Sequence, residues 1–159
     1  MKNLYRLQSL VLLGGTVFAW YTVVQDFRRF FDYEGTLLKF SDCFVPNPLM
    51  TPCFYGAFAF LIAFIWSLSI LFRPENQAVR HGHLRWLLVA GVIFAWSVNI
   101  YELIKWYSRA SGEPAIGCSG TIVSNPYSTP CFVGASIFLL ALIVSLVIIK
   151  KNKTSQSSV

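Results

Sequence analysis

Four cysteines carry the chemistry that this chain of 159 residues could perform. Cys43 and Cys53 belong to one segment and Cys118 and Cys131 to another, with the spacings Cys-x9-Cys and Cys-x12-Cys. In an exported segment, cysteines distributed in this way form disulfides. The sequence predicts two such bonds, Cys43–Cys53 and Cys118–Cys131, and leaves pairing across the two segments as an alternative.

Cys53 and Cys131 each follow a Thr-Pro dipeptide. Threonine is a good helix N-cap and proline is favoured at the first helical position, so both cysteines should lie in the first turn of a helix. There the helix dipole stabilises a thiolate, which indicates a redox-active pair. The other interpretation, which we favour, is that each disulfide only ties a long loop to a helix end. We therefore assign no catalytic residue, and the four cysteines are candidates only under the redox interpretation.

The elements that must position these cysteines are four apolar runs, at about 9–25, 53–72, 85–102 and 131–149. Hydrophobic residues make up 55% of the chain and charged residues only 13%, which excludes an ordinary soluble domain. Runs of this length can cross the hydrocarbon core of a bilayer as helices. The predicted fold is all-α, a polytopic membrane protein with a bundle of four transmembrane helices. The basic residues are scattered beside apolar runs, so we expect a lipid bilayer and no nucleic acid as partner.

Charge placement predicts the orientation. Eight Lys and Arg residues and one acid flank the termini and the short middle connection, whereas five Lys and Arg residues and six acids lie on the other side. The positive-inside rule then places both termini in the cytoplasm and the cysteine-bearing loops, 26–52 and 103–130, on the outer or periplasmic side of the plasma (inner) membrane. The polar tail 152–159 is predicted to be a disordered cytoplasmic segment.

The chain contains an internal duplication. The 24 positions from Asn47 to Ile70 match those from Asn125 to Ile148 with 15 identities and no gap, including the series Asn-Pro-x-x-Thr-Pro-Cys-Phe-x-Gly-Ala. Residues 1–78 form unit one and residues 79–151 form unit two. Because each unit has two spans, the copies should share one orientation and be related by a pseudo-twofold axis along the membrane normal. The duplication also favours disulfide pairing within each loop.

A second set of polar residues stands near the outer ends of spans one and three. Asp26 and Arg29 are three residues apart, as are Glu102 and Lys105 at the matching positions. These pairs, with Asn99, are candidate ligand or ion-pair residues, although interfacial anchoring is the commoner role of such pairs. Asn99 has no polar counterpart and is expected to join helices. His81 and His83 are placed in the cytoplasmic loop, and we expect no metal site.

Four spans, cytoplasmic termini and two cysteines in each outer loop resemble the disulfide-bond formation protein B family and the vitamin K epoxide reductases. That resemblance implies exchange with an exported thioredoxin-like partner and electron transfer to a quinone. Those families use a Cys-x-x-Cys pair, which is absent here, so no catalytic residue is carried over. Our leading hypothesis is an accessory or assembly partner of other membrane proteins that needs no cofactor. The alternative is a membrane thiol–disulfide oxidoreductase with a quinone cofactor.

Overall fold

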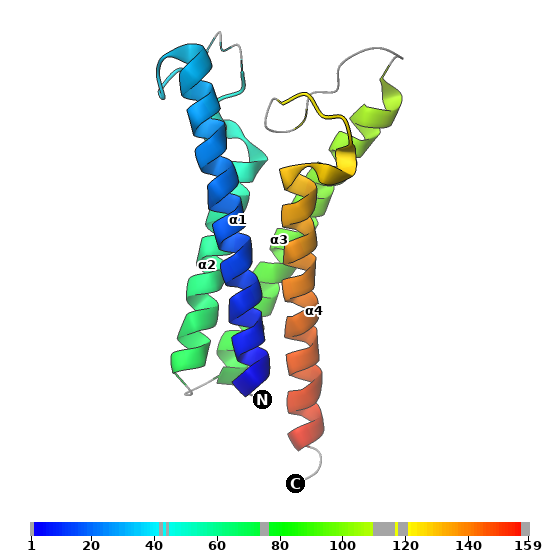
Figure 1. Cartoon of the computed structure of the whole chain (residues 1–159). Coiled ribbons are helices and arrows are strands. Elements are labelled where there is room, and N and C mark those ends of the chain that lie inside the picture. The colour runs from blue at the N-terminus through cyan, green and yellow to red at the C-terminus, as the bar shows by residue number, and fades with distance from the viewer. Residues whose placement is uncertain are drawn as a thin grey trace.

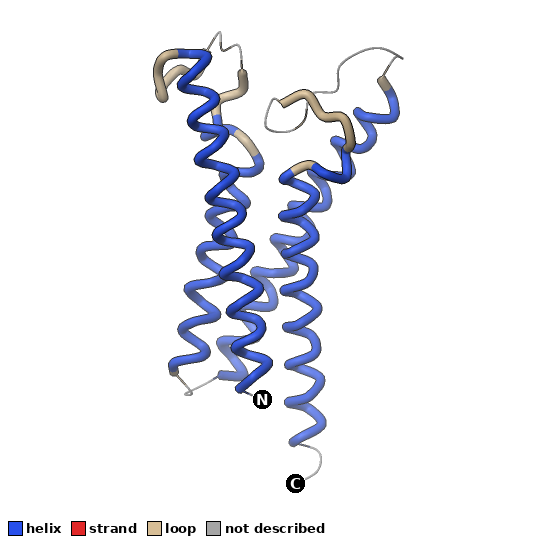
Figure 2. The backbone as a smooth tube through the Cα atoms, viewed as in Figure 1, coloured by secondary structure: helices blue, strands red, loops and turns tan. Residues whose placement is uncertain are grey.

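The computed structural model of the chain describes residues 2–41, 43, 45–73, 77–109, 117 and 121–156. In that part the long elements are α1 (Lys2–Glu34), α2 (Pro52–Phe72), α3 (Gln77–Ser108) and α4 (Pro130–Gln156). Two short 3-10 turns, η1 (Pro48–Met50) and η2 (Pro126–Ser128), precede α2 and α4 (Figure 2). The described residues contain no strand, which confirms the all-α prediction for them. All four long helices have the length and apolar composition needed to cross a membrane.

The helices form two hairpins, α1 with α2 and α3 with α4, that lie side by side (Figure 1). α1 also packs against α4, and α2 packs against α3. Both ends of the chain lie at one end of the bundle, here called the terminal end, and the loops that follow α1 and α3 lie at the opposite, loop end. The core between the hairpins is built from Leu12, Phe60, Ala63, Leu88 and Phe138, all buried.

α1 and α3 extend well beyond the apolar runs that predicted them. α1 has 33 residues, a length of about 50 Å, and continues to Glu34 instead of giving way to a loop at 26. The segment 25–34 contains no glycine or proline that would end a helix. Gly35 then adopts a positive φ of 67° and donates its N–H to the Phe31 carbonyl at 2.8 Å, a common helix C-terminus. α3 likewise reaches Ser108, past the predicted boundary at 102.

α4 continues to Gln156, into the segment that was expected to be a disordered tail. Residues 150–156 are polar but include no glycine or proline, so the backbone hydrogen bonds of the apolar part propagate through them. Residues 157–159 lie outside the described part of the chain.

Candidate functional site

The same turn precedes both cysteine-bearing helices. The side-chain oxygens of Asn47 and Asn125 each accept a hydrogen bond from the backbone N–H two residues later, at 2.9 and 3.0 Å. The hydroxyls of Thr51 and Thr129 each donate to the carbonyl three residues earlier, at 2.7 and 3.0 Å. Both helices begin at the proline that follows, as predicted. The repeated Asn-Pro-x-x-Thr-Pro series therefore builds the same local structure twice and places a cysteine in each first turn.

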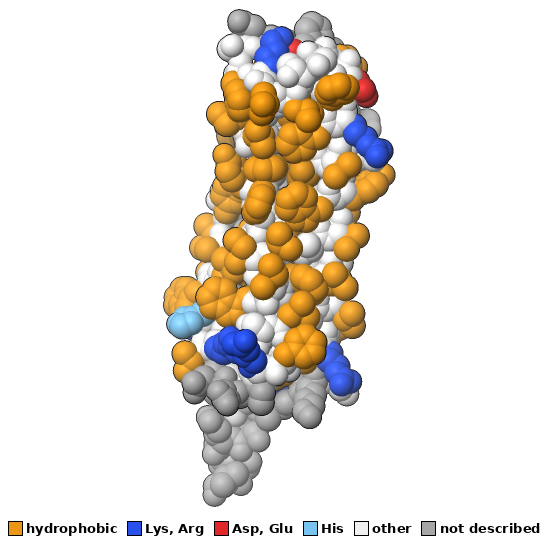
Figure 3. All heavy atoms as spheres, turned by 90° about the vertical axis from the view of Figure 1, so that its left-hand side faces the viewer, with side chains coloured by type: hydrophobic (Ala, Val, Ile, Leu, Met, Phe, Trp, Pro, Cys, Tyr) orange, Lys and Arg blue, Asp and Glu red, His pale blue; other side chains and the backbone are white. Residues whose placement is uncertain are grey.

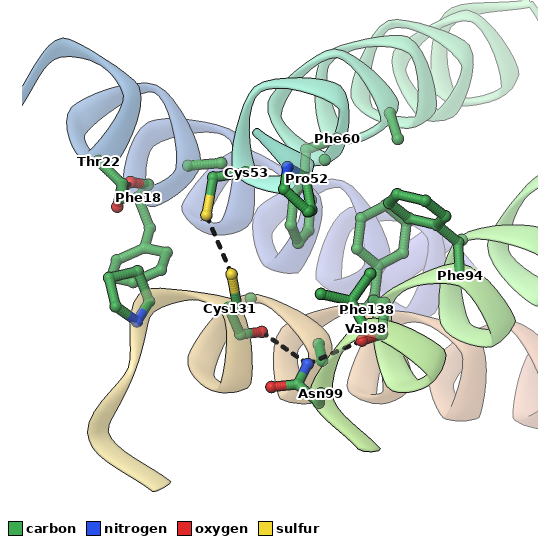
Figure 4. A pocket seen from close by; sticks show the side chains of 18 residues that line it. Phe18, Thr22, Pro52, Cys53, Phe60, Phe94, Val98, Asn99, Cys131 and Phe138 are labelled. Atoms are coloured by element: carbon green, nitrogen blue, oxygen red, sulfur yellow. Dashed lines mark hydrogen bonds between the residues drawn. The ribbon is translucent and has the colours of Figure 1, made fainter. Parts of the chain in front are cut away.

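Cys53 and Cys131 face each other across the two hairpins (Figure 4). Their Sγ atoms are 3.0 Å apart, although the residues are 78 positions apart in the chain. Both side chains are half-buried. Because each cysteine holds the same position on its helix, the pair lies where equivalent parts of the two hairpins meet.

The predicted Cys43–Cys53 disulfide is not formed in this structure, since both residues are thiols. Cys43 Sγ contacts the carbonyls of Lys39 and Ser41 in its own loop, at 3.4 and 3.7 Å. The physical reason is the direction of the first turn of α2, which points Cys53 toward Cys131 of the other hairpin (Figure 4). Cys118 lies outside the described residues, so its predicted bond to Cys131 stays a prediction.

An apolar pocket lies beside the cysteine pair, between the two hairpins. Its volume is about 70 Å³, and residues from all four helices line it. This volume holds a few water molecules or a small apolar group, and it is well below the roughly 300 Å³ of ordinary small-molecule sites. Thr22 and Asn99 contribute polar side chains to the lining, together with the two cysteines (Figure 4).

Two phenylalanines close the pocket on the side away from the cysteines. The rings of Phe60 and Phe138 pack with their centroids 4.0 Å apart. Each ring also fills the space beside a glycine of its own hairpin, Phe60 beside Gly15 and Phe138 beside Gly91. A Cβ added at Gly91 would lie 2.7 Å from the Phe138 ring, and one at Gly15 would overlap the Phe60 ring. Glycine is therefore required at both positions for helices this close.

Asn99 holds the start of α4 against α3. Its Nδ2 group donates to the Ala95 carbonyl at 2.8 Å in its own helix and to the Cys131 carbonyl at 3.2 Å in the next. The side chain is buried, and the matching position in unit one is Val23. The amide thus joins two helices and positions the backbone of Cys131.

Replacing Asn99 by valine should lower the free energy of unfolding by about 0.6–1.7 kcal/mol, the range measured for hydrogen bonds between membrane helices. The reason is that the Cys131 carbonyl loses its donor from α3. Thermal unfolding of the full chain in detergent measures the change. Ser97→Ala is the matched control, because Ser97 is exposed and donates only to Ile93 in its own helix. Equal stability of the Asn99→Val variant and the wild type would contradict the joining role.

The two acid–base pairs differ in their surroundings. Arg29 Nη2 lies 2.9 Å from Asp26 Oδ1, and the Asp26 side chain is only 7% exposed. Lys105 Nζ lies 3.9 Å from Glu102 Oε1, and the two side chains are 53% and 25% exposed. None of the four residues lines the pocket with the cysteines. Asp26 nevertheless lies near enough to Cys53 to interact with it electrostatically. Of the ligand and ion-pair candidates, only Asn99 lines the pocket.

The terminal end contains a buried polar cluster that the sequence did not predict. His81 lies in α3 and not in a loop, is buried, and has its Nε2 atom 3.1 Å from Gln8 Oε1 of α1. Tyr5 packs edge-on against the His81 ring and accepts a hydrogen bond from Asn152 of α4. The spacing of the residues could have predicted the burial of His81. This residue shares a helix face with Leu84 and Leu88, three and seven positions later, and both leucines are buried.

The described residues place no three His, Cys, Asp or Glu side chains close enough to hold a metal ion. The loop end instead holds the Cys53 thiol, whose Sγ atom lies 3.0 Å from Cys131 Sγ beside the apolar pocket. No protein family, curated protein or solved structure matches the chain, so its function is inferred from this geometry.

Proposed function

We propose that this chain is a small integral protein of the plasma (inner) membrane that acts as an accessory or assembly partner of other membrane components. Hydrophobic side chains cover the length of the bundle in Figure 3, and Lys and Arg side chains gather toward its ends, which supports insertion into a bilayer. The charge distribution supports a topology with both termini in the cytoplasm and the loop end on the outer or periplasmic side.

The proposed architecture is a parallel tandem repeat with a pseudo-twofold axis along the membrane normal. It is supported by three sets of equivalent contacts: the matched helix starts, the two glycine–phenylalanine contacts and the Cys53–Cys131 approach. In each case residues at aligned positions of the two units make the same contact, or meet one another.

The observation that carries the assembly role is a group of exposed apolar side chains at the loop end. Leu38, Phe40, Met50, Ile122 and Tyr127 are each at least half exposed and lie in the loops or short turns, outside the four long helices. These side chains lie outside the four helices that have the length and apolar composition needed to span a membrane. Exposed aromatic and aliphatic side chains are typical anchors of protein interfaces.

The loop after α1 is held in a defined shape, as an interface requires. Lys39 forms an ion pair with the buried carboxylate of Glu34 at the end of α1. Asn47 Nδ2 donates to the Lys39 carbonyl at 2.7 Å and so ties the two ends of the loop together. Leu38 and Phe40 therefore project from a segment that is fixed on both sides, which reduces the entropy lost on binding.

The variant Leu38→Ala/Phe40→Ala tests this role. We expect it to recover partner proteins from membranes, after cross-linking and purification in mild detergent, about tenfold less efficiently than the wild type, since truncation of an interface anchor commonly costs over 1 kcal/mol. Ile62→Ala/Ile65→Ala is the matched control, because these side chains are similarly exposed but lie on α2. Equal losses in both variants, or no stoichiometric partner of the wild type, would overturn the assembly role.

The close approach of Cys53 and Cys131 beside an apolar pocket favours a second candidate, a membrane thiol–disulfide oxidoreductase. In that reaction two thiols of an exported thioredoxin-like protein become a disulfide, and two electrons and two protons pass through the cysteine pair to a quinone, which becomes a hydroquinone. The pocket would have to widen to admit a quinone ring.

Thiol trapping in intact cells separates the two candidates. The oxidoreductase predicts that Cys53→Ser or Cys131→Ser captures an exported protein as a mixed disulfide through the remaining cysteine, whereas Cys43→Ser does not. It also predicts a quinone that co-purifies with the wild type. Normal oxidation of exported thiols in cells that carry Cys53→Ser/Cys131→Ser would exclude this candidate and leave the assembly role.

A further inference from the structure

We infer that the pocket between the two hairpins binds a small, neutral, apolar molecule that carries one hydroxyl group, of the size of a phenol. The inference does not rest on the assembly role, because it concerns a site inside the bundle of one chain. It starts from Asn99, which lines the pocket and is only 4% exposed. The Nδ2 group of Asn99 makes two hydrogen bonds, whereas none of the described residues donates to its Oδ1 atom.

This acceptor is unusual for its position. Buried polar groups are nearly always hydrogen-bonded, and a buried acceptor without a donor destabilises the fold. The aligned residue of unit one is Val23, which is also buried. An apolar side chain therefore suffices for packing at this position. The Nδ2 group of Asn99 joins α3 to α4, and the donor to its Oδ1 atom is supplied by the molecule in the pocket (Figure 4).

The pocket determines the size and the charge of its occupant. Its volume of about 70 Å³ corresponds to roughly five water molecules, or to one benzene ring with a single substituent. Four phenylalanines line it, two from each hairpin, and aromatic rings pack well against one another. The described lining residues include no Asp, Glu, Lys, Arg or His, so a charged ligand would lose its hydration without gaining a counter-charge.

Water and a lipid tail match the pocket less well. A buried water molecule needs about two to four polar partners, whereas most of the lining side chains are apolar. A lipid tail fills apolar space but carries no donor for Asn99. Thr22 is a second polar residue of the wall, and its hydroxyl already donates to the Phe18 carbonyl at 3.0 Å. A molecule that is apolar over most of its surface and donates one hydrogen bond satisfies both the wall and the Asn99 oxygen.

Binding of radiolabelled phenol to the full chain in detergent, measured by equilibrium dialysis, tests the site. The wild type should bind phenol saturably, in addition to the non-saturable partition of phenol into detergent. Gly134→Leu should remove the saturable part by filling the pocket, because Gly134 lines it and an added Cβ would lie 4.0 Å from the Phe60 ring. Gly14→Leu is the control, since Gly14 does not line the pocket and an added Cβ there meets no atom within 4 Å.

Asn99→Val tests the hydroxyl contact. This variant removes the acceptor and should weaken phenol binding about fivefold, the effect of one hydrogen bond. Toluene carries a methyl group in place of the hydroxyl, so its affinity should be the same for the variant and the wild type. Helix content and elution as a single species show that each variant is folded. Equal changes for the two ligands would overturn the role of Asn99, and a folded wild type without saturable phenol binding would overturn the site.

The two thiols give an independent measurement on the wild type. Cys53 lines the pocket, whereas Cys43 lies in the loop after α1. Phenol at ten times its Kd should slow the alkylation of Cys53 by N-ethylmaleimide about tenfold, in proportion to the unoccupied fraction. The alkylation of Cys43 should not change. Mass spectrometry of the digested chain measures both rates in one sample. Equal slowing of both thiols, or saturable binding with an unchanged rate at Cys53, would overturn the placement of the ligand, and neither result involves a partner protein.

Discussion

Replacing Arg29 by methionine should lower the free energy of unfolding by about 3–5 kcal/mol, the usual cost of removing one partner from a buried ion pair. Asp26 is the reason. Its side chain is 7% exposed and has one oxygen 2.9 Å from Arg29 Nη2, while its other oxygen is buried without a hydrogen-bond partner. Methionine keeps most of the aliphatic volume of arginine. The decrease in the free energy of unfolding therefore comes from the removed charge and not from lost packing.

The duplication supplies a matched control for this prediction. Lys105→Met removes the basic partner of Glu102 at the aligned position, where the charged atoms are 3.9 Å apart and the side chains are 53% and 25% exposed. Exposed pairs contribute only about 0–1 kcal/mol, so this variant should unfold almost as the wild type does. Thermal or denaturant unfolding of both variants in the same detergent measures the difference. Equal destabilisation of the two variants would show that Asp26 is not held by Arg29 in the way the structure indicates.

Gly15→Leu should be the most damaging substitution among the glycines of α1, with a loss of about 1–3 kcal/mol or more from overpacking. A side chain at this position would occupy the space of the Phe60 ring. That ring cannot move aside, because it is buried and packs against Phe138 at 4.0 Å. The added side chain must therefore push α1 away from α2 and disturb the contact between the hairpins.

The neighbouring Gly14 has no atom within 4 Å of an added Cβ, which makes Gly14→Leu the control. Leucine is a better helix former than glycine by roughly 0.5–1 kcal/mol, so this variant should be as stable as the wild type or more stable. Gly15→Leu/Phe60→Ala should lose less stability than the sum of the two single losses, since the two positions are in contact and their effects are not additive. Additive losses in the double variant would contradict the proposed contact.

Local features of the chain were predictable from its residues alone. The four helices follow from continuous apolar runs, and the starts of α2 and α4 follow from the Asn-Pro-x-x-Thr-Pro series, because capping and helix formation depend on residues within a few positions of one another. The lengths of α1 and α4 were underestimated. Apolar content defines the part suited to lipid, whereas the helical backbone continues until a residue such as Gly35 ends it.

The candidate site could not be predicted from the sequence, because it is formed by contacts between residues that are far apart in the chain. The duplication argued for Cys53 bonding within its own loop, yet the packing of the hairpins brings it to Cys131, 78 residues away. The sequence also treated Asp26–Arg29 and Glu102–Lys105 as equivalent. Only the tertiary structure shows that Asp26 is 7% exposed whereas Glu102 is 25% exposed, with a more exposed and more distant basic partner.

The sequence by itself therefore determined an all-α chain of two similar hairpins, with a cysteine in the first turn of each second helix. The tertiary structure decided which cysteines meet, which glycine is indispensable and which charge is buried. The physical reason is that each helix is specified by interactions along its own backbone. The contacts between hairpins depend instead on the shapes of whole helix faces, where Gly15, Phe60 and Phe138 set how closely α1, α2 and α4 approach.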